Sequence, residues 1–483
     1  MSTTLQVPLR AFRRASPRHL RSLRSPQWIR SYHAEGGVLE ELEARGLVSQ
    51  VTSRQKLQNF LQKPTVVYAG IDPTADYLHV GHLLPLITLY HFHLHGHRVI
   101  PLIGGATGLV GDPSGRDTER QLTGSAVVED NVRSLKSAVS QFFSQADKYV
   151  RRRAPTAPFE EAEIKAKNNL SWFKNMDLLA FLRKVGVHAR VNTMIARDSV
   201  QSRLSSQQGI SFTEFTYQLL QAYDFYHLHK EYGCAIQVGG SDQWGNILSG
   251  IDLINRLMPE VGPDGGHVEK VFGVTTPLLT TSSGAKFGKS AGNAVALEVG
   301  KTSVLDFYQF FLRVPDADVG KYLKMFTLLP LPMIEARIKE HEEKPEARLA
   351  QKLLAAEVTE LVHGDASVRT AEVATRLLYD GPTTSIPKAN SAEIIDALRG
   401  DPRLKFCSAS EAYSTTIAKL AAIHGLVPSN SAARTLIASK GLYLNSTPVR
   451  DIHQQLTEDD LLDKQCVILR VGSKRQIVVA LTN

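Results

Sequence analysis

The alternation of apolar and polar positions predicts a βαβ unit near the start of the chain. An extended apolar run, Thr65–Tyr68, ends near Gly70, and an apolar run of helical length begins at His79. A second apolar run, Val99–Ile103, leads into the glycine-rich turn that contains Asp112. Extended runs that end in glycine turns and flank a helical run indicate strand, helix and strand. We therefore expect a polar group at the end of each strand.

A second strand and helix repeat this arrangement further along the chain. The run Cys234–Val238 is followed by the turn Gly239–Asn246 and by a helical run, Ile247–Met258, and another extended segment covers Thr275–Thr281. In a doubly wound parallel sheet, ligands bind outside the carboxyl ends of the strands. The two glycine turns should therefore face each other across one α/β sheet of Rossmann type.

Helical periodicity dominates the segments around these strands. Val38–Phe60 and Val127–Val150 read as amphipathic helices, residues 165–210 as short helices and turns, and Val304–Tyr379 as a helical domain. The segment Gly381–Lys388, which contains two prolines, reads as a linker.

The C-terminal residues read as a small α+β module. Helices are expected at Thr415–Ile423 and Ala432–Ser439, with strands near Tyr443, at Val467–Arg470 and at Gln476–Leu481. The whole domain plan has these expected bounds: a leader at 1–33, the Rossmann-type domain at 34–290 with a helical connective insertion at about 120–235, an α-helical domain at 291–385, a linker at 386–411 and the α+β domain at 412–483.

One predicted helix carries a polar stripe. Ser211 followed by Glu214 is a helix start of capping-box type, and Tyr217, Gln221 and Asp224 then lie at i, i+4 and i+7 on one face. A polar stripe on a helix is normally solvated. Aromatic neighbours make this face too apolar for a plain surface, so we interpret the stripe as the wall of a pocket.

The net charge of +8 is concentrated at the N-terminus. Residues 1–33 contain seven arginines and no acid, and removing seven from 56 basic residues leaves 49 against 48 acidic ones. Total charge is therefore no argument for RNA binding by the rest of the chain. An Arg-rich, acid-free leader with serines is typical of a mitochondrial transit peptide, with a disordered basic tail as the alternative. Cleavage after Tyr32 would leave a mature chain that begins near His33.

Other residue patterns argue against membrane and metal functions. The sequence has no stretch of eighteen apolar residues that would span a membrane. Cys234, Cys407 and Cys466 form no Cys-x-x-Cys pair, which fits a reduced compartment without disulfides or structural zinc. The histidines that alternate over His91–His97 would point to different sides of a helix, so we expect no metal site there.

Two glycine-containing motifs resemble nucleotide sites only in part. Gly288–Ser290 could end a P-loop, but Ser283 occupies the position of its first glycine. The spacing of Gly105, Gly108 and Gly111 differs from the Gly-x-Gly-x-x-Gly dinucleotide fingerprint. A P-loop NTPase therefore stays a minor alternative, and a dehydrogenase is disfavoured.

His79 and His82 offer a better phosphate site. Residues three apart in the first turn of a helix share a face, next to unpaired backbone N–H groups and the positive end of the helix dipole. Such a corner binds phosphate. Taken alone, the two histidines could equally be capping or surface residues.

Both phosphate elements together resemble class I aminoacyl-tRNA synthetases. His79-Val80-Gly81-His82 is similar to the His-x-Gly-His signature of that family, and the segment Lys286–Ser290, Lys-Phe-Gly-Lys-Ser, is similar to its Lys-Met-Ser-Lys-Ser loop. Over nearly all of residues 38–483 the chain resembles bacterial-type tyrosyl-tRNA synthetases. The resemblance implies ATP-dependent attachment of tyrosine to tRNA through a tyrosyl adenylate.

This resemblance also implies roles for individual residues. The phenolic hydroxyl of the substrate would meet Tyr68 and Asp224. Its ammonium group would meet Asp112, Tyr217 and Gln221. Asp72 and Gln243 would line the pocket near the reacting carboxylate, and Gln237 would support these residues. Thr74, His79 and His82 would contact ATP phosphates, with Gly70, Gly239 and Asp242 at the nucleoside and Lys286, Lys289 and Ser290 at the pyrophosphate side. Ala69 departs from the family, in which Cys is frequent, and should only tune affinity.

The C-terminal module resembles an S4-type RNA-binding domain. The resemblance runs from Pro428 to Asn445, with Ser446 in place of a frequent glycine. Four basic residues are the expected phosphate contacts: Arg434, Lys440, Lys474 and Arg475. A plain α+β appendage is the alternative interpretation.

The resemblance implies tRNA(Tyr), tyrosine and Mg·ATP as substrates, no dedicated protein metal site, no membrane partner and a homodimer formed through the connective insertion. The leader implies the mitochondrial matrix. A synthetase-derived RNA-binding protein, such as a group I intron splicing cofactor, is the alternative, and Arg151–Arg153, expected in a loop, would be a place for its RNA contact. The ligase is favoured because both phosphate motifs and the polar stripe are intact.

Overall fold

The computed structural model describes residues 37–115, 118, 123–154, 164–205, 209–261, 268–282, 287, 294–379, 390–472 and 475–482, and the main chain of 289, 290 and 293. The expected leader, the linker 381–388 and the side chains of Lys286, Lys289, Ser290 and Lys474 lie outside the described residues. Two compact units are present: one extends to Leu297 and includes Pro315–Ala350, and the other contains Glu298–Val314 and Gln351–Asn483.

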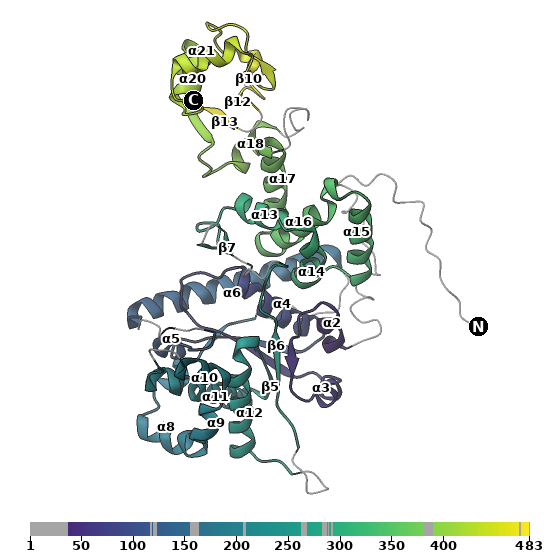
Figure 1. Ribbon diagram of the computed structural model, residues 1–483, viewed down its shortest axis with the longest axis vertical. Helices are drawn as coiled ribbons and strands as arrows, with labels where there is room; N and C mark the ends of the chain where they lie inside the picture. Colours follow the sequence, from purple (N-terminus) through teal and green to yellow (C-terminus); the bar gives the residue numbers. More distant parts are fainter. Residues whose placement is uncertain are drawn as a thin grey trace, which may run out of the picture. The chain divides into compact units, whose positions relative to one another are not determined.

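The first unit is built on a six-stranded sheet with the order β1-β6-β5-β2-β3-β4 (Figure 1). All neighbouring strands run parallel except β1 and β6. The strands are β1 (Gln50–Val51), β2 (Val66–Ile71), β3 (Arg98–Ile103), β4 (Lys167–Asn168), β5 (Cys234–Gly240) and β6 (Phe272–Thr276). The apolar runs of β2, β3, β5 and β6 are mostly buried, as expected for strands covered on both faces of a sheet.

The strand order creates the place for a ligand. From β2 the chain crosses to β3, whereas from β5 it crosses to β6 in the opposite direction. Right-handed crossovers therefore put helix α4 (Val80–Leu94) and helix α12 (Trp244–Leu257) on different faces of the sheet (Figure 1). The loops after β2 and β5 diverge at this switch point and leave a crevice at the carboxyl ends of the strands.

Helices of several lengths complete the first unit. They are α2 (Val38–Ala44), α3 (Arg54–Phe60), α5 (Thr107–Val110), α6 (Ser125–Arg153), α7 (Leu170–Phe173), α8 (Leu178–Lys184), α9 (Val191–Ile195), α10 (Asp198–Leu204), α11 (Phe212–Tyr232), α14 (Asp316–Phe326) and α15 (Leu331–Glu343). The helix start expected at Ser211 is confirmed, because its hydroxyl accepts a hydrogen bond from the Glu214 amide at 3.3 Å.

Two expectations about this unit were wrong. Val38–Phe60 is not one helix, because Gly46 adopts a positive φ of 72° after α2 and the chain then pairs as β1 with β6. Arg151–Arg153 do not lie in a loop but form the last turn of α6. Arginine favours helices, and its charge stabilises the negative end of the helix dipole.

The second unit combines helices with an antiparallel-rich sheet. The helices are α13 (Val304–Leu312), α16 (Leu349–His363, mostly in this unit), α17 (Asp365–Tyr379), α18 (Ser391–Ala397), α19 (Ala409–Ser414), α20 (Ile417–Ile423) and α21 (Asn430–Ala438). The sheet has the order β11-β10-β12-β13-β9, with β9 (Leu404–Ser408), β10 (Leu442–Leu444), β11 (Thr447–Pro448), β12 (Cys466–Val471) and β13 (Arg475–Thr482).

The expected domain bounds and the structure differ at two places. Within 291–385, α14 and α15 belong to the first compact unit. Within 386–411, expected as a linker, β9 pairs in parallel with β13, Leu404 lying opposite Val478. Such pairing depends on a strand 74 residues away in sequence, so periodicity alone gives little sign of it. Among the described helices, none has the length and apolarity needed to cross a bilayer.

Candidate active site

Tyr68 and Asp224 form the deep end of the crevice. Tyr68 lies on β2 with 1% of its surface exposed, and Asp224 lies on α11 with 3% exposed. The Tyr68 hydroxyl has no hydrogen-bond partner among the described residues. Burial, with the nearby Asp224 charge, raises the pKa of Tyr68 well above its usual value. A buried hydroxyl without a partner points to a polar ligand group at this place.

Asp224 is held by two side chains from the segment after β4. Asn169 Nδ2 donates to one carboxylate oxygen at 3.0 Å, and Trp172 Nε1 donates to the other at 2.8 Å. The Trp172 ring stacks on His227 with 4.3 Å between ring centroids. Burial raises the pKa of Asp224 to about 8, and the two donors oppose that rise. The carboxylate therefore keeps a fixed orientation toward the pocket.

Asp72, just after β2, is fixed in a similar way. Thr107 Oγ1 donates to one of its oxygens at 2.8 Å, and the Tyr217 hydroxyl donates to the other at 2.7 Å. Asn169 Nδ2 also donates to Thr107 Oγ1 at 3.1 Å, which links the two ends of the pocket. Gly104 packs so closely here that a Cβ atom would collide with the side chains of Asp72 and Thr107.

Asp112, after β3, anchors a second polar cluster. It accepts hydrogen bonds from the Ser114 amide at 2.9 Å and from Gln243 Nε2 at 2.7 Å. Asn246 Nδ2 donates to Gln221 at 3.0 Å and to Gln243 at 3.2 Å. Burial raises the pKa of Asp112. The cluster thus joins the turn after β3, helix α11 and the turn after β5.

Tyr217 stands among all three carboxylates. Burial raises its pKa well above the usual value, and the charges of Asp72, Asp112 and Asp224 add to that rise. Gln237, opposite Tyr68 in the β2–β5 register, keeps a buried side-chain oxygen without a partner among the described residues. A pocket lined by several carboxylates favours a cationic group. The deep end of the pocket, at Tyr68 and Asp224, also favours a ligand that carries a hydroxyl group.

His79 and His82 stand at the start of α4. His79 Nδ1 accepts a hydrogen bond from the Gly81 amide at 3.1 Å, and His82 Nδ1 accepts from the His79 amide at 3.1 Å. Both Nδ1 atoms therefore act as acceptors, which leaves the Nε2 atoms as donors. The rings stack with 3.9 Å between centroids. Burial and the neighbouring His79 lower the pKa of His82 to about 3, so it donates as a neutral imidazole.

Other predicted nucleotide residues lie along the same crevice. Thr74 is exposed two residues after Asp72. Gly70 is exposed on β2, where an added Cβ would meet open space. At the end of β5, a Cβ on Gly239 would press on Gln243 at 3.0 Å, and Asp242 is exposed. These positions flank the switch point between β2 and β5.

The segment after the predicted lysine loop returns to the histidines. The main chain of Lys289–Ser290 forms β7 and pairs with β8, Asn293–Ala294. The Val80 amide then donates to the Val295 carbonyl at 2.9 Å, and the Leu297 amide donates to the Leu78 carbonyl at 2.8 Å. The chain on the far side of the loop therefore runs directly beside His79.

The predicted RNA contacts lie on the surface of the C-terminal module. Arg434 on α21, Lys440 just after it and Arg475 at the start of β13 are all exposed. Lys440 has a positive φ of 57°, which turns the chain into β10.

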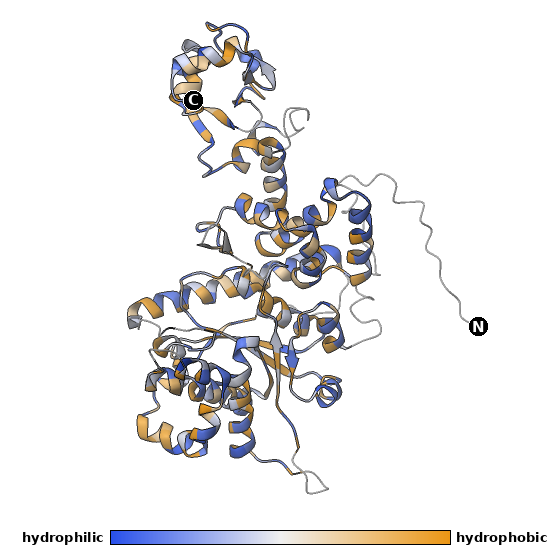
Figure 2. Ribbon diagram, in the orientation of Figure 1, coloured by the Kyte–Doolittle hydropathy of each residue, from blue (hydrophilic) through white to orange (hydrophobic). Residues whose placement is uncertain are grey.

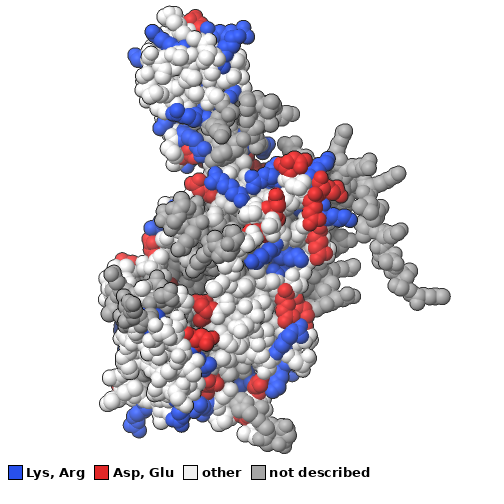
Figure 3. Space-filling model, in the orientation of Figure 1, with Lys and Arg blue, Asp and Glu red and all other residues white. Residues whose placement is uncertain are grey.

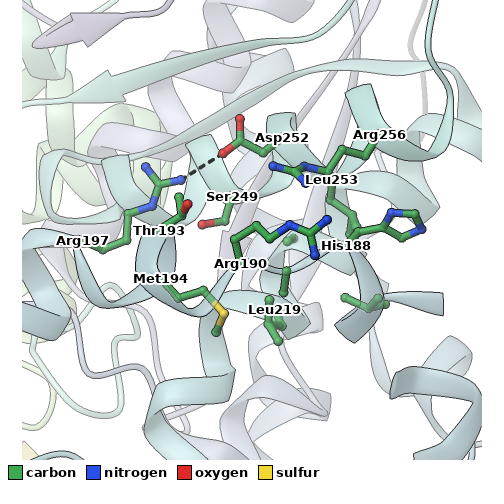
Figure 4. Close-up of a pocket in the computed structure, with 13 residues that line it drawn as sticks. His188, Arg190, Thr193, Met194, Arg197, Leu219, Ser249, Asp252, Leu253 and Arg256 are labelled. Atoms are coloured by element: carbon green, nitrogen blue, oxygen red, sulfur yellow. Dashed lines mark hydrogen bonds and ion pairs between the residues drawn. The ribbon is translucent and has the colours of Figure 1, made fainter. Parts of the chain in front are cut away.

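A separate basic pocket lies in the first unit, between the segment 185–197 and helices α11 and α12. Figure 4 shows Arg190, Arg197 and Arg256 around it, with His188 at its side. Arg197 pairs with Asp252 at 3.1 Å, and Asp252 is the acidic residue that lines the pocket. The pocket was not predicted, because its cations come from separate segments and form no local motif.

Five other site residues were missed from the sequence: Thr107, Ser114, Asn169, Trp172 and Asn246. A buried carboxylate requires hydrogen-bond donors. An acidic residue expected in the pocket therefore indicates that donor side chains must lie nearby, but not which ones. Their positions in the sequence carry no periodic or motif signature.

Comparison with known proteins identifies close relatives. Residues 60–380 match tRNA synthetases class I (W and Y), and residues 393–479 match the tyrosine–tRNA ligase SYY-like C-terminal domain. A mitochondrial tyrosine–tRNA ligase of Drosophila melanogaster is 40% identical over 439 residues, which is 90% of this chain and 91% of that protein. A Saccharomyces cerevisiae mitochondrial tyrosine–tRNA ligase is 40% identical over 453 residues, 92% of this chain and 88% of that protein.

A solved structure agrees. A C-terminally truncated Aspergillus nidulans mitochondrial tyrosyl-tRNA synthetase superposes with a TM-score of 0.65 at 36% identity, over 73% of this chain and 98% of that one. The Rossmann-type fold class expected from the sequence is confirmed. The segment around Lys289 lies inside the matched region, so the P-loop NTPase interpretation is not favoured.

The raised pKa of Asp224 leads to an expected pH dependence of stability. Its pKa is about 8 in the folded protein against a usual value of 3.8, so the folded state keeps a proton that the unfolded chain releases. Stability from this group is therefore lost as pH rises from about 4 to about 8. The unfolding temperature of Asp224→Asn minus that of the wild type should rise from about pH 5 to about pH 9 in calorimetry.

The matched control is Asp242→Asn, which alters an exposed carboxyl at the edge of the same crevice. Its difference from the wild type should stay level over the same range. A level difference for Asp224→Asn as well would contradict the raised pKa.

Proposed function

This chain belongs to the tyrosine–tRNA ligases of the class I tRNA synthetase family, and we propose that the crevice binds tyrosine and ATP, joins them as tyrosyl adenylate and passes the tyrosyl group to tRNA. The observation that carries these site assignments is the unpartnered Tyr68 hydroxyl beside Asp224. A phenolic hydroxyl could donate to a carboxyl oxygen of Asp224 and accept from the Tyr68 hydroxyl.

This pair also gives a reason for selectivity. If phenylalanine entered, the buried Tyr68 hydroxyl would stay without a partner and Asp224 would lose the hydrogen bond from the substrate. The desolvation cost would therefore fall on the wrong substrate. Rejection of phenylalanine by tyrosyl-tRNA synthetases is itself the usual illustration of this effect. At the other end, Asp112, Tyr217 and Gln221 offer a carboxylate and neutral acceptors for the ammonium group, and Asp72, Gln237 and Gln243 border the substrate carboxylate.

Activation is attack by the tyrosine carboxylate on the α-phosphate of ATP, with pyrophosphate as the leaving group. Negative charge builds on phosphoryl oxygens, so positioned donors matter more than a general base. His79 and His82 would donate through Nε2, Thr74 through its hydroxyl, and Lys286 and Lys289 through ammonium groups. Gly70, Gly239 and Asp242 would border the nucleoside, and Ser290 would lie beside Lys289. Mg²⁺, held by the ATP phosphates, would neutralise part of their charge.

We expect Asp224→Ala to lower tyrosine-dependent ATP–pyrophosphate exchange by at least about tenfold, because the hydroxyl of the substrate loses its acceptor. Tyr68→Phe should raise the KM for tyrosine and narrow the preference over phenylalanine. The control is Arg151→Ala, on the exposed last turn of α6, which should exchange at the wild-type rate. Equal and mild effects of Asp224→Ala and Arg151→Ala would reject the pocket assignment.

The C-terminal module and the basic pocket support contacts with tRNA. Lys and Arg side chains gather at several places on the visible surface of the C-terminal module, at the top of Figure 3. Arg434, Lys440 and Arg475 are exposed there, and Lys474 would join them. The arginines of Figure 4 offer further phosphate contacts on the catalytic unit.

Replacing Arg434 and Lys440 together by Gln should weaken tRNA binding. Each lost phosphate contact should reduce the slope of log K against log salt by about one, as measured by filter binding over a salt series. Lys464→Gln is the control, because Lys464 is exposed in the same module and pairs with Glu458. An unchanged slope in the double variant would argue against these contacts.

A second copy of this chain is the proposed partner of the connective insertion. Eight large apolar side chains between residues 178 and 212 are exposed, among them Leu178 at 71%, Leu179 at 70% and Phe212 at 76%. Figure 2 shows this concentration of apolar residues around α8. An apolar patch of this kind marks an interface, and a two-fold dimer would cover the same patch on both copies.

Leu178→Asp combined with Leu179→Asp should convert the dimer to a monomer in light scattering coupled to size exclusion. A charge on each side of a two-fold interface repels its own copy. Ile423→Asp, at an exposed apolar position of α20, should leave the mass unchanged. A dimeric Leu178/Leu179 variant would place the interface elsewhere.

The mitochondrial relatives support a mitochondrial location. We place the protein in the matrix, where mitochondrial tRNA is charged, with residues 1–33 as the transit peptide. The splicing alternative has no support from a particular observation, since Arg151–Arg153 end a helix as its cationic last turn.

A further inference from the structure

A short segment before β7 is fastened to helix α14. The Phe287 amide donates to the Leu279 carbonyl at 2.9 Å, which joins the two sides of the undescribed stretch 283–286. The side chains at both positions are buried, Leu279 being 8% and Phe287 9% exposed. Residues 279–287 and α14 belong to the same compact unit.

Asp318 holds one side of this segment. Its carboxylate is 3% exposed and accepts the Ser282 amide at 3.0 and 3.1 Å and the Ser282 hydroxyl at 3.1 Å. Hydrogen bonds to a charged acceptor are about twice as strong as neutral ones. A buried carboxylate also carries a desolvation cost that only such donors offset. Ser282 therefore has one favoured position against α14.

Tyr322 and Phe326 hold the other side. They follow Asp318 at i+4 and i+8, so all three side chains share one face of α14. The Tyr322 hydroxyl donates to the Thr280 carbonyl at 2.9 Å. The Phe287 ring lies 4.2 Å from the Tyr322 ring and 5.9 Å from the Phe326 ring, measured between centroids. One helix face thus contacts residues 280, 282 and 287.

Phe287 lies between the two predicted lysines in the sequence. Lys286 precedes it directly, and Lys289 follows two residues later. Further along, Val295 and Leu297 are hydrogen-bonded to the chain beside His79. The described chain is therefore attached to α14 before Lys286, at Thr280 and Ser282, and between the two lysines, at Phe287. After Lys289 it is attached to the main chain beside His79, through Val295 and Leu297.

We propose that Asp318 and Tyr322 are positioning residues for tyrosine activation. By fixing Ser282, Thr280 and Phe287, they set the point from which the two lysine ammonium groups reach the pyrophosphate side of ATP. A misplacement of about 1 Å at such a site can cost on the order of a hundredfold in rate. The inference rests on the proposed role of Lys286 and Lys289.

The test separates the two chemical steps in the full-length protein. The rate of tyrosyl adenylate formation is measured in single turnovers over a series of ATP concentrations. The rate of transfer from preformed adenylate to tRNA is measured separately. The tyrosine Kd is measured by equilibrium dialysis. Asp318→Ala should slow adenylate formation by about tenfold or more and raise the half-saturating ATP concentration. The tyrosine Kd should stay within about twofold of the wild type, because the hydrogen bonds described in the tyrosine pocket come from elements other than α14. The transfer rate should stay within the same range, because pyrophosphate has already left before that step.

Two milder variants keep the test informative if Asp318→Ala folds poorly. Tyr322→Phe removes only the hydrogen bond to Thr280 and keeps the ring on Phe287, so it should give a smaller loss in the same step. Asp318→Asn keeps one acceptor oxygen for Ser282 and should recover part of the rate. Asp316→Ala is the control, since Asp316 lies on the same helix and is paired with His341 at 3.0 Å.

Wild-type adenylate formation in Asp318→Ala and Tyr322→Phe would overturn the inference, as would equal losses in tyrosine binding and transfer. Lys286→Ala, measured in parallel, separates this failure from a failure of the proposed function. If Lys286→Ala activates tyrosine normally, the lysine role is wrong. If it is impaired while the α14 variants are not, only the anchoring is wrong.

Discussion

The site depends on buried carboxyl groups that must keep one orientation and remain able to ionise. Removing a carboxylate from water is costly unless donors replace the lost solvent. Asn169 and Trp172 do this for Asp224, and Thr107 and Tyr217 do it for Asp72. Since these donors come from the segment after β4, from α5 and from α11, the pocket forms only when these elements are assembled.

The sheet topology makes this assembly possible. Parallel strands bring the residues after β2, β3 and β5 to one edge, and the switch between β2 and β5 opens the crevice there. Helix α11 supplies its polar stripe from the side. A tyrosine in this crevice would have its hydroxyl at Tyr68 and its ammonium group near Asp112, so the rigid sheet fixes the distance between the two recognition points.

The phosphate side is organised by helix ends rather than by strands. His79 and His82 are fixed as Nε2 donors because their Nδ1 atoms cap the first turn of α4. The described residues around the two predicted lysines are attached to α14 and to the main chain beside His79. Buried hydrogen bonds at a distance from the proposed chemistry thus fix the chain on both sides of the lysines.

The sequence by itself determined the features that depend on neighbours in the chain. Apolar runs and helical periodicity specified β2, β3, β5 and α11, and local spacing identified His79 with His82 and the stripe of Tyr217, Gln221 and Asp224. Only the tertiary structure decided the donors Asn169 and Trp172, the role of α14, the split of Val38–Phe60 and the strand β9 within an expected linker. The physical reason is that strand pairing and side-chain hydrogen bonding join residues far apart in sequence, and such contacts leave no local pattern.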